Sequence, residues 1–386
     1  MIKWMLKYGA VIFILNIFLA SIESTFVVSS IIFKVIMVVY SVLFLVNIFQ
    51  LKNVIFHKAF SVFLFINLIN IFYFLLFHSI NDIEAIQFLL ARIIQFTIIS
   101  TSIYYNFEYY KHNFLNHLTI FISILVAIGF LLNPDIISDR YSGLIWNSNT
   151  LSVFVIMAFS VLLLKEKRKE QIDYLILGLL LLTSLATGSR GVIIGIGLAY
   201  LLKYRFSSRI FLYLIIGVGL YSVLINFNLF TSANRFAEQS VFNDRILQYK
   251  YAYQTFLQKP LFGFGLDKYS FINTDLIPEY VYSSVDGSIL ASHNGYIALL
   301  IQYGILFGLF IIFLIFRKIF FLWSYFEKSI DINRTYLYIL IFGVLGAIYE
   351  TLITGINDFH TFLFWFSLAF LSYSKYRDKF EVKNGN

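Results

Sequence analysis

The sequence predicts an all-α polytopic membrane protein, with about twelve transmembrane helices in a single transmembrane domain over residues 1–386. Of the 386 residues, 60% are hydrophobic and only 13% are charged, which is too little polar surface to enclose a water-soluble core of this size. Apolar runs long enough to cross a bilayer recur along the whole chain. The 45 Phe and 27 Tyr accompany only 3 Pro, a composition that favours continuous helices over short alternating strands.

The expected spans follow the apolar runs and the polar breaks between them. In chain order they are residues 9–22, 27–49, 59–78, 86–104, 115–132, 149–164, 173–187, 191–203, 210–228, 294–316, 335–354 and 359–373. Between the ninth and tenth spans lies the longest polar segment, residues 229–292. We expect this segment to be a loop with short amphipathic helices, of which residues 249–257 are the clearest, ending near Lys259 and Pro260.

The basic residues predict the orientation of the chain. With a cytoplasmic N-terminus, the inner segments hold 20 of the 29 Lys and Arg residues, and cytoplasmic loops carry such an excess. Both termini would then be cytoplasmic and the 229–292 loop extracytoplasmic. Five of the seven outer basic residues fall in this loop, which indicates an anionic partner there, although long loops also tolerate ordinary solvated charge. The excess of basic residues in the cytoplasmic segments accounts for the net charge of +8, so nucleic acid is not an expected partner.

Cysteine and the outer acidic residues limit the chemistry. The chain has no cysteine, which excludes disulfides, thiolate metal sites and a thiol nucleophile. No cofactor is expected. The acidic residues of the predicted outer loop are too scattered in sequence to predict a metal site, as the positions of Asp244, Asp267, Asp275, Glu279 and Asp286 illustrate.

An arginine flanked by glycines is expected at the outer surface between the seventh and eighth spans. Residues 187–191 read Thr-Gly-Ser-Arg-Gly, and the glycines let the backbone approach a ligand closely where a helix begins. Free N–H groups at a helix N-terminus favour phosphate, and arginine binds phosphate through two parallel hydrogen bonds. The segment therefore predicts an anion site at Arg190. The alternative is a tight helical hairpin whose arginine reaches the lipid headgroups.

A histidine stands where the tenth span begins. Residues 292–296 read Ser-His-Asn-Gly-Tyr, and an imidazole at this boundary can exchange protons near neutral pH. His293 is therefore a candidate catalytic residue, the alternative being a structural or solvated histidine. Asp358 and His360, with Glu350 nearby, would either line the same cavity or form caps and buried pairs within the fold.

Short motifs follow one another in a fixed order on the predicted outer side. They are Ser189-Arg190-Gly191 after an apolar run, Arg235 and Arg245 in the long loop, Pro260 followed by Gly263 and Gly265, His293-Asn294 with Tyr296, and Gly304 with Gly308. In this order, and with the twelve-span layout, the chain resembles the O-antigen ligase and O-antigen polymerase superfamily. The resemblance is clearest over residues 140–316, while the first five spans match only as hydrophobic helices.

The resemblance implies transfer of a glycan from an undecaprenyl-pyrophosphate carrier to an acceptor sugar at the outer face of the bacterial cytoplasmic (inner) membrane. It implies that Arg190 and Arg245, assisted by Arg235, bind the pyrophosphate, and that Arg245 and His293 are catalytic. These cations would stabilise the departing diphosphate without a metal ion, and His293 would activate the acceptor hydroxyl for an inverting displacement. Further candidates for the lining of the site are Asn294, Tyr296, Lys250 and Arg92. Arg92, near Gln95 in the fourth span, could instead belong to a buried structural pair.

Three activities remain open. A polymerase would extend lipid-linked O-antigen or capsular polysaccharide, with a chain-length regulator protein as a further partner, and we prefer it because aromatic-rich, divergent chains of this kind are commoner among polymerases. A ligase would transfer the finished glycan to lipid A core. A flippase for the same lipid-linked glycan also needs about a dozen helices, but it predicts functional charges on both faces and an inverted repeat, and neither is evident.

Overall fold

The computed structural model describes residues 2–136, 140–165, 170–205, 243–279, 291–326 and 333–384. Within these ranges the regular structure is entirely helical, as predicted. The first half of the chain contains α1 (Ile2–Ala20), α2 (Phe26–Val46), α3 (Ile48–Ile55), α4 (Ser61–Phe77), α5 (Ile83–His112), α6 (Phe114–Leu132) and α7 (Ser148–Leu164). The second half contains α8 (Gln171–Ala186), α9 (Arg190–Tyr204), α12 (Asn243–Gln258), α14 (Gly295–Phe326), α15 (Asn333–Gly346) and α16 (Phe359–Asn384).

Membrane spans are evident in both halves of the chain. Among the described residues, six helices are long and apolar enough to cross a bilayer, namely α1, α2, α4, α5, α6 and α14. This supports a multi-pass membrane protein. Eleven of the predicted spans have a helix at their position, whereas the predicted span 210–228 lies outside the described residues, so the count of twelve stays a prediction. The amphipathic helix expected at 249–257 is part of α12, which ends just before Lys259 as predicted.

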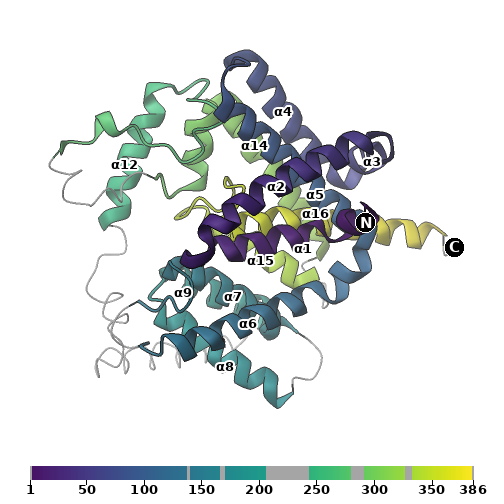
Figure 1. The fold of residues 1–386 in the computed structure, drawn as a ribbon, viewed down its shortest axis with the longest axis vertical. Coiled ribbons are helices and arrows are strands. Elements are labelled where there is room, and N and C mark those ends of the chain that lie inside the picture. The colour runs from purple at the N-terminus through teal and green to yellow at the C-terminus, as the bar shows by residue number, and fades with distance from the viewer. Residues whose placement is uncertain are drawn as a thin grey trace.

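The helices run between two ends of the molecule. Figure 1 shows both termini at one end and α12 at the other. At the centre, residues 359–372 of α16 are buried on every side, as expected for a helix that is apolar all round. Aromatic rings of neighbouring helices pack on it, such as Phe13 of α1 against Phe362 at 4.9 Å between ring centroids. By contrast, α2 exposes most of its apolar side chains, which is suited to contact with lipid.

α15 is shorter than predicted. The sequence favours a helix to residue 354, but α15 ends at Gly346, where a Cβ atom would collide with the side chain of Leu352. The chain then forms an irregular connection, residues 347–358, before α16 begins. The backbone of this connection is used by other elements, since the carbonyl of Ala347 accepts the N–H of Gly295 at 2.8 Å. These contacts replace the hydrogen bonds that a continued helix would have made.

A loop fills a break in α14. Gly304 interrupts this helix with φ +68° and ψ −177°, a conformation essentially confined to glycine. The loop 260–265 bonds to the broken turn through Phe264 N–H to the Ile301 carbonyl (2.8 Å), Gly265 N–H to the Gln302 carbonyl (3.1 Å) and Ile305 N–H to the Pro260 carbonyl (2.8 Å). A Cβ atom on Gly304 would collide with the carbonyl of Leu261, and one on Gly263 would lie 2.5 Å from that of Gln302. The two glycines therefore allow one backbone to cross another.

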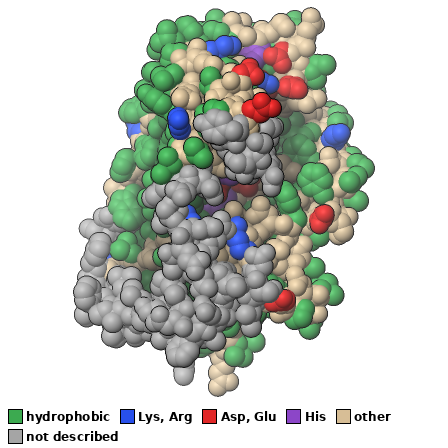
Figure 2. Space-filling view, turned by 90° about the vertical axis from the view of Figure 1, so that its left-hand side faces the viewer, with side chains coloured by type: hydrophobic (Ala, Val, Ile, Leu, Met, Phe, Trp, Pro, Cys, Tyr) green, Lys and Arg blue, Asp and Glu red, His purple; other side chains and the backbone are tan. Residues whose placement is uncertain are grey.

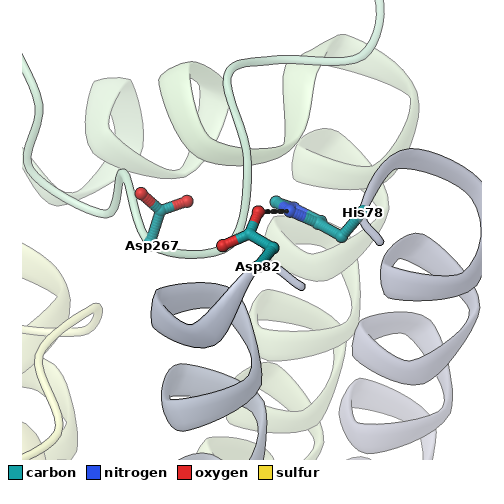
Figure 3. Close-up of side chains that lie close together, drawn as sticks. All are labelled: His78, Asp82 and Asp267. Atoms are coloured by element: carbon teal, nitrogen blue, oxygen red, sulfur yellow. Dashed lines mark hydrogen bonds and ion pairs between the residues drawn. The ribbon is translucent and has the colours of Figure 1, made fainter. Parts of the chain in front are cut away.

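A polar clasp fastens the same loop segment to the turn between α4 and α5. Figure 3 shows His78 and Asp82 of this turn near Asp267, which belongs to the segment after α12. The Nδ1 of His78 is hydrogen-bonded to Asp82 at 2.6 Å, which lowers the pKa of that carboxyl, and its Nε2 accepts the N–H of Leu266 at 3.1 Å. Asp267 forms an ion pair with Lys268. The atoms of these three side chains that could bind a metal ion lie within 4.8 Å of one another. Each side chain already has a protein partner, so the contacts of the clasp explain why the three lie close together.

Candidate functional site

A cavity of about 530 Å³ lies at the end of the bundle that carries α12. Its walls come from α7, α9, α12, α15, the 347–358 connection and the first turn of α16, and its polar lining includes Arg140, Asn149, Arg190, Tyr249, His293, Tyr349, Glu350, Asn357, Asp358 and His360. Figure 2 looks onto this side of the molecule, where charged side chains of both signs gather among apolar ones. The size and mixed lining suit a polar ligand with an apolar portion.

One wall of the cavity carries two guanidinium groups. Arg190 is the first residue of α9, and the turn before it is possible because Gly188 has φ +61°. Arg140 reaches the same turn, since its Nε donates to the carbonyl of Thr187 at 3.0 Å and its Nη2 donates to Asn149 at 2.5 Å. The arrangement sets a pair of fixed cations beside a helix N-terminus, which is a favourable environment for phosphate.

Arg140 was not among the site residues predicted from the sequence. A usable signal was nevertheless present, because Arg140 and Arg190 are the two basic residues assigned to the outer side that lie outside the 229–292 loop. Both line the cavity. An outer basic residue in a short segment goes against the positive-inside rule and therefore indicates a function more strongly than one in a long loop.

The cavity lining also includes His293, which is paired with a carboxylate. The Nδ1 of His293 lies 2.9 Å from Oε2 of Glu350, and both side chains are partly exposed, at 30% and 24%. A carboxylate only accepts, so Nδ1 carries the proton and Nε2 is left as the basic nitrogen. His293 also has φ +42°, in the left-handed region that non-glycine residues seldom adopt. Such strain is typical of functional residues, and here it accompanies an oriented imidazole.

Asn294 and Tyr296 hold the histidine motif in place. The Oδ1 of Asn294 caps α14 by accepting the N–H groups of Tyr296 and Ile297, each at 3.0 Å, and its amide donates to the carbonyl of Ile348 at 2.8 Å. The hydroxyl of Tyr296 donates to the carbonyl of Val344 at 2.8 Å. The sequence predicted that these two residues line the site. They lie beside the lining residues instead, and they attach the histidine motif to α15 and to the 347–358 connection.

Arg92 is buried and positions a cavity wall from behind. Its guanidinium donates to Gln95 at 2.9 Å and to the carbonyl of Thr354, while the amide of Gln95 donates to the carbonyl of Ile356 at 2.8 Å. Of the two alternatives that the sequence left open, the geometry supports the structural one. Arg92 and Gln95 of α5 thereby hold the 347–358 connection, which contributes Glu350 and Asp358 to the cavity.

Replacing Arg92 by leucine is expected to loosen this wall. The substitution removes the donors from the Thr354 carbonyl and from Gln95, and an unsatisfied buried polar group costs about 1–3 kcal/mol of stability. The purified variant should melt at a lower temperature than the wild type. Lys34→Met, which changes a basic residue on the exposed surface of α2, serves as the control and should leave the melting temperature unchanged. An Arg92→Leu variant as stable as the wild type would contradict the structural role.

The remaining predicted site residues belong to the long loop. Arg235 lies outside the described residues, and Arg245 lies in the first turn of α12. Lys250 is exposed on α12 with its ammonium 5.6 Å from the ring centre of Tyr251. α12 contributes Tyr249 to the cavity, and the hydroxyl of Tyr249 donates to the carbonyl of Ile348 at 2.8 Å. The roles of the three basic residues stay predictions.

Asp358 and His360 line the cavity where α16 begins. The Oδ2 of Asp358 accepts the N–H of Thr361 at 2.8 Å, so this aspartate caps the helix as well. Its side chain is open to the cavity but surrounded by protein, and the limited hydration raises the pKa of its carboxyl. Both of the roles considered for Asp358 from the sequence, cap and cavity lining, are therefore present together.

Comparison with known families gives a match over part of the chain. Residues 175–314 match a family model described as O-antigen ligase. For this part of the chain the match confirms the resemblance inferred from the motifs. The matched range contains Arg190, Arg245, His293 and the crossing of Gly263 with Gly304, while Arg140 and Glu350 lie outside it. A search of curated proteins gives no match to the chain.

Proposed function

We propose that the protein is a polymerase of O-antigen or capsular polysaccharide, and the match of residues 175–314 to the O-antigen ligase family supports glycan transfer in general. It transfers a glycan from an undecaprenyl-pyrophosphate donor to a lipid-linked acceptor sugar at the outer face of the bacterial inner membrane. The observation that carries this proposal is a single cavity in which two guanidinium groups, Arg140 and Arg190, share the lining with the His293–Glu350 pair. The first pair suits a diphosphate leaving group, and the second suits activation of a hydroxyl.

The donor step requires charge stabilisation. As the bond between the anomeric carbon and the phosphate oxygen breaks, negative charge develops on the departing diphosphate. Arg140 and Arg190, which line the cavity, would stabilise this charge, and the N–H groups at the start of α9 would add to the stabilisation. Arg245, from the first turn of α12, would complete the set. Fixed cations of this kind can supply the stabilisation that a divalent metal ion supplies elsewhere.

The acceptor step requires a base. The acceptor hydroxyl gives its proton to Nε2 of His293 as its oxygen forms the new bond to the anomeric carbon, on the side opposite the diphosphate. Glu350 holds the imidazole in the tautomer that leaves Nε2 basic, and it stabilises the imidazolium that forms. Direct displacement of this kind inverts the anomeric configuration.

The second candidate is a ligase, and the description of the matched family favours it. A ligase would use the same donor chemistry and differ only in the acceptor. Surface glycan from a deletion strain separates the two. Loss of a polymerase should leave single repeat units attached to the final acceptor, whereas loss of a ligase should leave none. Loss of a flippase would also leave none, but purified flippase would make no glycosidic bond.

The decisive measurement is transfer by the purified full-length protein in lipid nanodiscs, supplied with lipid-linked repeat units extracted from a deletion strain. Longer lipid-linked products are expected with the wild type, and EDTA should not reduce their formation. Arg190→Ala should slow transfer by about 10²–10³-fold, because it removes one donor from a developing anion, and Arg190→Lys should recover part of the loss.

The matched control is Arg317→Ala, which removes an exposed arginine from α14 outside the cavity. It should transfer at the wild-type rate. Equal rates for Arg190→Ala and Arg317→Ala would remove Arg190 from the mechanism. Absence of longer products with the wild type would reject the polymerase proposal.

A further inference from the structure

Buried polar atoms without partners lie at the α16 end of the cavity. Both ring nitrogens of His360 and the Oδ1 of Asn357 are buried and have no hydrogen-bond partner among the described residues. The His360 side chain is only 1% exposed, yet it belongs to the cavity lining, as does Asn357. Buried polar atoms are nearly always hydrogen-bonded, so a group of unpaired ones beside a cavity indicates that something else supplies the partners.

These atoms, together with Asp358, are mostly hydrogen-bond acceptors. The carboxylate of Asp358 accepts hydrogen bonds from the start of α16 and can accept more, and the Asn357 oxygen can only accept. A neutral imidazole has one donor and one acceptor. Phosphate oxygens bring no hydrogen and are repelled by a carboxylate. Hydroxyl groups both donate and accept, so a polyhydroxylated ligand matches this end of the cavity.

The cavity lining carries both signs of charge. Arg140 and Arg190 are its basic groups and suit the diphosphate, whereas Glu350 and Asp358 make their part of the lining acidic. The acidic part also contains His293, the proposed base, through its bond to Glu350. A sugar held there would present its hydroxyl to the base while the donor diphosphate stays on the cationic wall.

We propose that Asn357, Asp358 and His360 form a subsite that binds the hydroxyl groups of the acceptor sugar, with His360 as a determinant of specificity. This inference deepens the proposed glycan transfer, and its placement of the acceptor rests on that function. The binding of a neutral sugar at these three residues does not depend on catalysis. It can therefore be measured separately.

The experiment uses the purified full-length protein in nanodiscs and two probes. One probe is a fluorescently labelled oligosaccharide, released from lipid-linked repeat units of the host by mild acid and dephosphorylated, and the other is inorganic pyrophosphate. His360→Leu, which removes both ring nitrogens, should weaken oligosaccharide binding by about five- to tenfold, as expected for the loss of one or two hydrogen bonds. Its pyrophosphate affinity should not change. His360→Gln, which restores a donor and an acceptor, should recover part of the loss.

Two further variants keep the test independent of a folding defect. Asn357→Ala removes a subsite acceptor from the connection before α16 and should also weaken oligosaccharide binding without affecting pyrophosphate. Ser367→Ala is the matched control, because it removes a buried hydroxyl of α16 that also has no hydrogen-bond partner among the described residues but lies outside the cavity lining. It should bind both probes as the wild type does.

The outcomes separate the two proposals. Unchanged oligosaccharide binding in both His360→Leu and Asn357→Ala would overturn the subsite, since water would then satisfy these atoms. Equal weakening of both probes, or no oligosaccharide binding by the wild type, would also overturn it. Selective weakening supports it even if the wild type makes no glycosidic bond, a result that would reject the transferase function alone.

Discussion

Replacing His293 by alanine is expected to reduce glycan transfer by about 10²–10⁴-fold at unchanged protein level, the range that general-base catalysis typically contributes. The imidazole is the residue of the cavity whose tautomer is set by a carboxylate, and alanine leaves the acceptor hydroxyl without a base. Transfer to the lipid-linked acceptor, measured as the rate of product formation under saturating donor, checks the prediction. Because the base acts in the chemical step, kcat should fall more than the affinity for pyrophosphate.

His293→Asn sharpens this test. Asparagine tolerates the left-handed backbone of this position better than alanine, so it preserves the local fold, but it cannot take up a proton. It should be as inactive as alanine while melting at the wild-type temperature. Glu350→Gln should retain intermediate activity, because the imidazole stays but its tautomer is no longer imposed. Full activity of either His293 variant would end the assignment of His293 as the base.

Replacing Gly304 by alanine is expected to prevent accumulation of folded protein. Its backbone conformation is nearly exclusive to glycine, and the added Cβ would collide with the Leu261 carbonyl, which belongs to the loop that fills the break in α14. Strain and displaced hydrogen bonds together should cost more than about 4 kcal/mol, the range seen when a special backbone site is lost. The measurement is the amount of full-length protein in isolated membranes and its melting temperature after purification.

Gly197→Ala is the matched control for this variant. Gly197 lies inside α9, has no neighbouring atom within 4 Å of an added Cβ, and has an ordinary helical backbone. Alanine there should leave the melting temperature unchanged or raise it slightly, since glycine in a helix interior is unfavourable by roughly 0.5–1 kcal/mol. If Gly304→Ala accumulates and melts like Gly197→Ala, the crossing with loop 260–265 is not required for the fold.

The sequence predicted the helices well because lipid requires long apolar runs, and such runs are visible without knowledge of their packing. It was less able to predict where a helix ends. The apolar residues Ile348, Leu352 and Ile353 continue the pattern of α15 past Gly346, so residues 347–358 look helical although they form a connection. Their conformation depends on partners such as Gly295, which composition and periodicity do not reveal.

The candidate site was also predictable only in part, because some of its residues carry a local signal and others do not. Arg190 and His293 each carry a local signal, and the structure brings both to one cavity. The partner of His293 is 57 residues away in sequence, and Arg140 reaches its place through the carbonyl of Thr187. Local patterns identify residues able to do chemistry, whereas tertiary packing decides which of them meet.

The crossing of loop 260–265 with α14 also constrains biogenesis. In lipid an unpaired backbone group costs several kcal/mol, so the break at Gly304 is tolerable only once the loop has supplied its hydrogen bonds. The loop precedes α14 in the chain and is therefore synthesised first. We expect α14 to enter the bilayer as an uninterrupted helix and to open at Gly304 when the loop docks, so that the docking of this loop is the late step of assembly.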